Sequence, residues 1–322
     1  MVELSMLRIA EMVPTEADAY RLLEQWRWHG KPVCPHCESI NDHYLLKPKN
    51  GIARTNRGTP TQRRQWKCKD CRMKFSVLTG TVMHGTHIPI RTWVFVIYEL
   101  CSNKNGVAAR EIERRYELTP KSAWLMLHRI REAMVQDPTA GLFSGVVVAD
   151  ETWIGGKPRN RHADKRVESK QGKTDKTPVV SLVHTETGEV RSKVVASVSG
   201  NTLRSAIREQ VHMAETTLHT DAAGAYGTFA AELAGHASVN HMAGEYVRDG
   251  VSTNQAENYF SQLKRSITGT HHHVSKGHLH RYVAEFDFRH SLHKVSDTER
   301  VDHLMGRVAG RRLMYADSSA GA

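Results

Sequence analysis

Long apolar runs are missing from this sequence of 322 residues. No stretch approaches the roughly 20 consecutive apolar residues that a membrane-spanning helix needs. The N-terminal segment Met1–Leu7 carries the acidic Glu3 and lacks the pattern of a secretory signal peptide. Internal repeats and low-complexity tracts are also missing, so a repeat architecture is not expected. We therefore expect a cytoplasmic protein of two or three globular domains.

Acidic residues are outnumbered by basic ones. The chain has 34 Asp and Glu against 45 Lys and Arg, a formal net charge of +11 and a pI of about 9.5. A soluble protein this basic commonly binds a polyanion such as nucleic acid. The alternative is a charge that only improves solubility, and the clustering of basic residues along the chain favours the polyanion.

Cysteine is scarce, with five in the chain, and four of them form two C-x-x-C pairs. Two thiolate pairs of this spacing can complete a closed tetrahedral Zn²⁺ site, which is structural rather than catalytic. Thirty residues lie between the pairs, more than in the usual zinc ribbon. No thioredoxin-like βαβ pattern surrounds either pair, which disfavours a redox role. The predicted zinc ligands are Cys34, Cys37, Cys68 and Cys71.

Two helices with a tight turn between them are expected from Val107 to Tyr116 and from Pro120 to Met134. Thr119 is placed to cap the second helix. This cadence is typical of a helix-turn-helix that reads DNA, although an ordinary α-hairpin has the same periodicity. The side chains predicted to face DNA are Lys121, Ser122, His128, Arg129 and Arg131.

Carboxylates follow two predicted strands in the C-terminal half of the chain. Asp150 comes directly after the apolar run Gly145–Ala149, and Asp221 comes directly after Thr216–Thr220. Because side chains alternate along a strand, Asp150 and Glu151 face opposite sides, so only one of them can share a metal site with Asp221. We assign Asp150 to that site because it directly follows the apolar run. The order of strands and helices predicts a mixed sheet with helices on its faces.

A third carboxylate, Glu257, begins a predicted helix, and 35 residues separate it from Asp221. Lys264 lies two turns later on the same face, followed by Arg265, where both can contact a phosphate. Carboxylates at two strand ends and one helix can hold two divalent metal ions that promote phosphodiester cleavage. Two alternatives stay open: Asn254 and Glu257 can form a capping box without catalysis, or Asn254 can be the ligand through its amide oxygen.

Taken in order, these motifs carry a family resemblance. They are Cys34-x-x-Cys37, Cys68-x-x-Cys71, the two helices, Asp150-Glu151-Thr152-Trp153-Ile154-Gly155-Gly156, Thr220-Asp221, Val239-Asn240-His241, Thr253-Asn254-Gln255-Ala256-Glu257, Leu263-Lys264-Arg265 and Gly269-Thr270-His271-His272-His273-Val274-Ser275. From about residue 15 to 292, the chain resembles the bacterial DDE-type insertion-sequence transposases of the ISXO type.

The resemblance implies an enzyme that cuts DNA at element ends and transfers the strands into target DNA, with Mg²⁺ or Mn²⁺. It implies an N-terminal zinc ribbon and an RNase H-like, retroviral-integrase-like catalytic domain, hence a multidomain α+β or α/β fold. The carried-over catalytic positions are Asp150, Asp221, Lys264 and either Glu257 or Asn254. The implied partner is double-stranded DNA, bound by a homodimer or larger assembly in the cytoplasm, at the nucleoid. Nothing carries over to the basic segment 157–176.

The predicted domains are a helix and zinc ribbon over residues 1–85, a helical region over 86–138, the catalytic domain over 143–295 and a tail over 296–322. Two other functions fit the same motifs. One is a DNA-binding regulator with an inactive RNase H-like domain, and the other is a stand-alone nuclease that cuts without joining.

Overall fold

The computed structural model describes residues 3–40, 43–48, 53–54, 60–136, 140–156, 176–221, 224–240, 243, 245 and 247–319. The chain divides into two compact units. The first unit joins residues 1–134 to residues 295–318, and the second contains residues 135–294. Most of the segment predicted as a C-terminal tail therefore belongs to the first unit, while the other predicted domain boundaries stay predictions.

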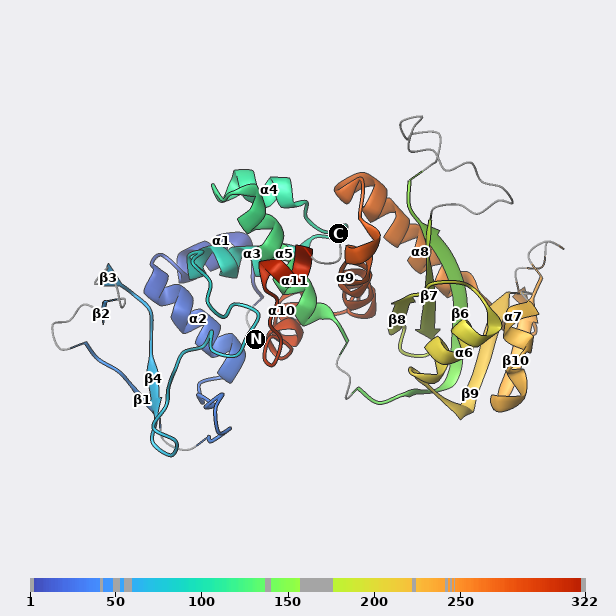
Figure 1. Ribbon diagram of the computed structural model, residues 1–322, viewed down its shortest axis with the longest axis horizontal. Helices are drawn as coiled ribbons and strands as arrows, with labels where there is room; N and C mark the ends of the chain where they lie inside the picture. The colour runs from blue at the N-terminus through green and yellow to red at the C-terminus, as the bar shows by residue number, and fades with distance from the viewer. Residues whose placement is uncertain are drawn as a thin grey trace. The chain divides into compact units, whose positions relative to one another are not determined.

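The first unit is mostly helical, with short strands around the cysteines (Figure 1). Its helices are α1 (Met6–Met12), α2 (Glu16–Trp28), α3 (Ile90–Ser102), α4 (Ala109–Arg115), α5 (Pro120–Met134), α10 (Asp297–Met305) and α11 (Tyr315–Ser319). Its strands are β1 (His43–Leu45), β2 (Ala53–Arg54), β3 (Pro60–Thr61), β4 (Trp66–Cys68) and β5 (Lys74–Phe75). Strand β4 pairs antiparallel with both β1 and β5.

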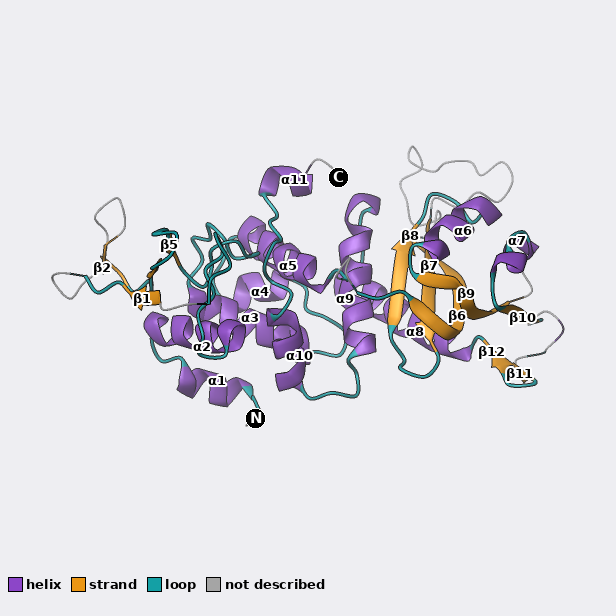
Figure 2. Cartoon of the chain, turned by 90° about the horizontal axis from the view of Figure 1, so that it is seen from below, coloured by secondary structure: helices purple, strands orange, loops and turns teal. Residues whose placement is uncertain are grey.

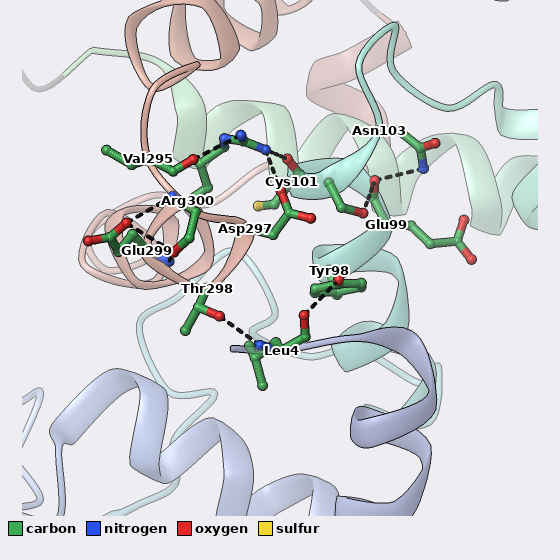
Figure 3. A network of polar contacts seen from close by, with 12 residues as sticks. Leu4, Tyr98, Glu99, Cys101, Asn103, Val295, Asp297, Thr298, Glu299 and Arg300 are labelled. Carbon is green, nitrogen blue, oxygen red and sulfur yellow. Dashed lines mark hydrogen bonds and ion pairs between the residues drawn. The ribbon is translucent and has the colours of Figure 1, made fainter. Parts of the chain in front are cut away.

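The segment after the second unit is held in the first unit by a polar network (Figure 3). The backbone N–H of Leu4 donates to the Thr298 hydroxyl at 2.8 Å, and the Tyr98 hydroxyl donates to the Leu4 carbonyl at 3.0 Å. The Arg300 guanidinium donates to the Cys101 carbonyl at 2.8 Å. Helix α10 packs against α2, α3 and α5, so this segment is part of the helical core rather than a tail.

The second unit is a five-stranded mixed sheet with helices on both faces, drawn by type of element in Figure 2. Its strands are β6 (Phe143–Ile154), β7 (Thr177–His184), β8 (Val190–Val194), β9 (Val211–Asp221) and β10 (Gly235–Val239), with a small hairpin of β11 (Val247–Arg248) and β12 (Val251–Ser252). Its helices are α6 (Gly200–Arg208), α7 (Gly224–Gly227), α8 (Asn254–Ser266) and α9 (Leu279–Ser291). The sheet order is β10-β9-β6-β7-β8, and the predicted mixed sheet is confirmed. Among the described residues, no helix has both the length and the apolar character needed to cross a membrane.

Two cores lie on opposite faces of this sheet. On the face covered by α6 and α7, the buried residues include Val147, Ala149, Leu218 and Tyr226. On the face covered by α8 and α9, they include Val148, Ile154, Tyr259, Leu263 and Phe286. Side chains of β6 therefore alternate between the faces, with the even-numbered positions toward α8 and α9.

Strand β6 runs past the point at which the sequence predicts its end. Its parallel pairing with β9 stops at Val148 and His219, but its antiparallel pairing with β7 continues to Ile154. Asp150 therefore lies within the strand, just beyond the end of the parallel ladder. The prediction of a strand end at Asp150 is wrong, because β7 supplies a ladder that does not need apolar side chains on β6.

A polar cluster fastens α8 and α9 to the sheet. Asp287 of α9 accepts hydrogen bonds from the Tyr259 hydroxyl of α8 at 2.5 Å and from the Ser192 hydroxyl of β8 at 2.7 Å. Ser192 also lies 2.7 Å from Ser181 of β7, oxygen to oxygen. Ser181 is in register with both Ser192 and Asp150, so a row of polar residues crosses three strands. This cluster links the position of α8 to the strand that carries Asp150.

We predict that the substitution Asp287→Asn weakens the pH dependence of stability. Burial, against the lowering effect of its hydrogen bonds, raises the pKa of Asp287 from 3.8 to about 7. Between these values the folded chain holds a proton that the unfolded chain releases, so stability falls as pH rises through the window. In the variant, the decrease in the free energy of unfolding with pH should be smaller by up to about 1.4 kcal/mol per pH unit. Urea unfolding at a series of pH values measures this slope.

The matched control is Asp249→Asn, which makes the same change at an exposed residue of the β11–β12 turn. Its φ of 48° suits asparagine, so the fold tolerates it. Equal slopes for the two variants would contradict the role given to Asp287.

Candidate functional site

The four cysteines of the two C-x-x-C pairs converge on one point. The sulfurs of Cys34 and Cys71 are 3.6 Å apart, those of Cys37 and Cys68 are 3.7 Å apart, and all four lie within 4.8 Å of one another. A tetrahedral site with Zn–S bonds of about 2.3 Å has sulfurs about 3.8 Å apart. In the described part of the chain, no other group of three or more His, Cys, Asp or Glu is arranged to hold a metal. The predicted cluster is present and its geometry suits a structural zinc ion.

The two cysteine pairs sit in turns of the same construction. The backbone N–H of Cys34 donates to the carbonyl of Ser39 at 3.0 Å, and that of Cys68 donates to the carbonyl of Met73 at 3.0 Å, five residues on in each case. The residue after each second cysteine is left-handed, with φ of 58° at Glu38 and 62° at Arg72. Two equivalent knuckles therefore present their sulfurs to a common centre.

The electrostatics of the cluster also fit a bound cation. Although burial raises the pKa of Cys68, the backbone N–H groups of Cys71 and Asp70 outweigh it and lower the pKa to about 7. The backbone N–H of Met73 lowers the pKa of Cys71, but burial and the three neighbouring sulfurs raise it to about 12. Four thiolates this close repel one another, and a divalent cation at their centre removes that repulsion.

We predict one zinc ion per chain, lost in the variant Cys68→Ser. Because a closed Cys₄ site contributes directly to folding, this variant should also melt at a lower temperature in its first unit. Elemental analysis and thermal unfolding measure both effects. Cys101→Ala is the control, since Cys101 is buried in α3 and outside the cluster, and it should keep full zinc content. Zinc retained by Cys68→Ser would argue against the assignment.

In the second unit, register brings two carboxylates to one face of the sheet. The last paired residues of β6 and β9 are Val148 and His219. Two positions farther along each strand lie Asp150 and Asp221, so the two residues are level on neighbouring parallel strands. Residues that are level on parallel strands point to the same side, here the side of Val148 and therefore of α8.

Glu151 points the other way, as alternation predicts. It accepts a hydrogen bond from the hydroxyl of Tyr226, a fully buried residue of the α6 and α7 core. Burial, with the negative charges of Asp150 and Asp221, raises the pKa of Glu151 to about 7, against the lowering effect of the Tyr226 bond. The influence of both aspartates on one group means that all three carboxyls lie in one electrostatic neighbourhood. Sequence patterns gave no sign of the Glu151–Tyr226 pair.

Helix α8 carries the two candidates for the third position. Asn254 is the first helical residue, Thr253 is the N-cap without a capping bond from its side chain, and the Asn254 N–H donates to the Ser252 hydroxyl at 3.1 Å. The alternative of a capping box led by Asn254 is therefore wrong. Asn254, Glu257 and Lys264 are all exposed, with Glu257 and Lys264 two turns apart on one continuous helix. The helix packs on β6 and β7.

Comparison with known proteins matches both halves of this arrangement. Residues 142–291 match the ISXO2-like transposase domain, and residues 14–74 match the transposase zinc-ribbon domain. The chain therefore carries a domain similar to that of the ISXO2-like transposases together with a transposase zinc ribbon. It is also 26% identical over 302 residues to an uncharacterized protein in transposable element ISH50 of Halobacterium salinarum. The aligned region covers 90% of this chain and 96% of the relative.

Transposase domains imply DNA binding, and the structure sorts the residues predicted to contact DNA. Helix α5 starts at Pro120 as predicted, and the Thr119 hydroxyl accepts from the Ser122 N–H at 3.2 Å. The prediction for Arg131 is wrong, because its side chain is only 1% exposed. It follows Ala123 by eight residues and so falls on the same buried helix face.

The other predicted DNA contacts differ in exposure. His128 is also buried, with its ring centroid 4.1 Å from that of Trp124, so the prediction that it faces DNA is wrong as well. Arg129 is partly buried and its Nε donates to the Leu313 carbonyl at 2.9 Å. Lys121, like Lys264 and Arg265 in the second unit, is exposed. The basic segment 157–175 and His241 lie outside the described residues.

Proposed function

We propose that this transposase cuts DNA at the ends of its insertion element and joins the freed ends to target DNA, using an RNase H-like catalytic unit and divalent metal ions. The observation that carries the proposal is the pairing of Asp150 and Asp221, level on parallel strands and directed to the face of α8. Two acidic groups that share a face repel each other when ionised, and a bound cation or a retained proton offsets that repulsion.

The residues of this face suit the binding of Mg²⁺ or Mn²⁺. Carboxylate oxygens are the ligands these ions prefer, and Asp150 and Asp221 supply two such groups. Glu257 or Asn254, at the start of α8, would supply the third ligand. A divalent cation supplies the charge that activates a water or hydroxyl nucleophile and stabilises the leaving oxygen.

The remaining roles belong to the chain's own groups. In the first step, water attacks the phosphorus at the element end and the 3′-oxygen leaves as a hydroxyl. In the second step, this hydroxyl attacks the phosphorus of a target phosphodiester, and the target strand's own 3′-oxygen leaves as a hydroxyl. Lys264, two turns beyond Glu257, is positioned to contact a neighbouring phosphate, with Arg265 beside it. Tyr226 holds Glu151 on the opposite face, which keeps that carboxyl from competing with Asp150.

DNA recognition is assigned to the first unit. The zinc knuckles and the α4–α5 pair provide a rigid scaffold for exposed basic residues such as Lys121, which can contact phosphates. Joining two element ends requires two active sites, so we propose a homodimer or larger assembly on DNA.

We predict that Asp150→Asn and Asp221→Asn abolish Mg²⁺-dependent nicking of a duplex that carries the element end. A lost metal ligand removes several kcal/mol of transition-state stabilisation, a fall of at least about 100-fold. DNA binding measured without added divalent metal should persist, because a carboxylate does not bind a phosphate unless a cation lies between them. The control Asp249→Asn makes the same chemical change at an exposed turn and should keep full activity.

The same assay separates the rival functions. A strand-transfer reaction with labelled ends yields joined product from a transposase but only cut ends from a stand-alone nuclease. Wild-type protein that binds ends and never cuts them points to a regulator. Full nicking by Asp150→Asn would overturn the active-site assignment.

A comparison of Glu257→Gln with Asn254→Ala identifies the third ligand. We expect Glu257→Gln to lose nicking as severely as the aspartate variants, since a carboxylate binds these ions more strongly than an amide. Asn254→Ala should retain most activity. The reverse ranking, measured at saturating Mg²⁺, would assign the position to Asn254 instead.

A further inference from the structure

A basic pocket of about 340 Å³ lies beside the first zinc knuckle. Three segments line it: the knuckle, the turn that follows the ribbon, and the C-terminal part of the first unit. The residues that matter for its chemistry are His36, Gly80, His84, Gly310, Arg311 and Arg312. No acidic side chain is among the described residues that line it.

Backbone pairing builds this pocket from distant parts of the sequence. The N–H of Gly310 donates to the carbonyl of Gly80 at 2.9 Å, and that of Val82 donates to the carbonyl of Val308 at 3.1 Å. Gly80 and Gly310 have φ of 70° and 72°, a left-handed conformation that favours glycine. The C-terminal segment is thus fixed against the residues that follow the ribbon, and its arginines are held at the pocket.

Arginines outside the lining add to the positive charge at the pocket. Burial, followed by the positive charges of Arg312, Arg63 and Arg129, lowers the pKa of His84. These guanidinium groups are therefore close enough to act on one imidazole. Arg311 donates to the carbonyl of Glu132, which orients it, while Arg312 is exposed at the mouth.

We propose that this pocket binds a phosphate group of the DNA backbone, with Arg312 as its principal contact. A guanidinium offers two parallel hydrogen bonds to phosphate oxygens, and a partly enclosed site strengthens them relative to open water. Arg311 and Arg312 lie outside both regions that match transposase domains. The inference rests on the proposed function in one respect, that DNA is the polyanion this protein binds.

The test measures binding of the full-length, zinc-loaded protein to a random-sequence duplex of about 30 base pairs at several NaCl concentrations, with no divalent metal added. Each phosphate contact contributes about 0.9 to the slope of log affinity against log salt. Arg312→Ala should lower that slope by about 0.9 and weaken binding by about fivefold to tenfold at 0.1 M NaCl. Arg312→Lys keeps the charge and should keep most of the slope.

The matched control is Arg8→Ala, which removes an exposed arginine of α1 that does not line the pocket. It should bind as the wild type does. If Arg312→Ala loses zinc, Arg312→Gln repeats the test while keeping much of the side-chain stem and removing the charge. Wild-type affinity and slope in these variants, or weaker binding with an unchanged slope, would overturn the phosphate site.

Failure here is distinguishable from failure of the proposed function, because nicking with Mg²⁺ is scored separately. If the wild type never nicks DNA but Arg312→Ala lowers the salt-dependence slope, the phosphate pocket is supported and the catalytic proposal is contradicted. A wild type that nicks, with a slope unchanged in the variant, removes the pocket alone. A wild type without affinity for duplex DNA overturns the pocket as well.

Discussion

Parallel pairing of β6 with β9 is the constraint on which the candidate active site depends. It sets Asp150 and Asp221 level on adjacent strands and sends both toward α8. A shift of one residue would turn one of the two carboxyls to the opposite face, where Glu151 already bonds Tyr226. The apolar residues beneath the pair, Val147 on one side and Val148 on the other, fix that register through two separate cores. The position of the acidic pair is therefore a consequence of burial elsewhere in the sheet.

Local patterns were sufficient to predict those features that local physics decides. Alternation along a strand predicted opposite faces for Asp150 and Glu151, and the run of strands predicted a mixed sheet, because both follow from backbone geometry. The length of β6 was not predictable in this way. Its polar residues after Ala149 interrupt the apolar run, and only the partner strand β7 extends the ladder through them.

Sequence patterns fail to predict the structure where the fold depends on partners remote in the sequence, or where the charge of a residue and its position on a helix point to different environments. The charge of Arg131 suggests a DNA contact, yet its spacing from Ala123 puts it on the buried side of α5. The segment after residue 295 carries helix signals of its own, namely the capping box of Ser296 and Glu299 and the buried apolar residues Val301, Leu304, Met305 and Val308. Its place is decided by contacts such as that between Leu4 and Thr298, nearly the whole chain apart. No window of sequence contains both partners.

The zinc cluster fixes the local structure of the first unit, as the parallel ladder of β6 and β9 does for the second. Strands of two or three residues bury too little apolar area to be stable alone, so the ribbon depends on its metal for a fixed shape. The knuckle at Pro35 and His36 then forms one wall of the basic pocket, whose other wall is the strand-like pairing of Gly80 with Gly310. Loss of zinc should therefore disturb that wall, and with it the proposed contact at Arg312, while leaving the sheet of the second unit intact. With the proposed phosphate site, the structural metal and the affinity for DNA would be coupled through this shared wall.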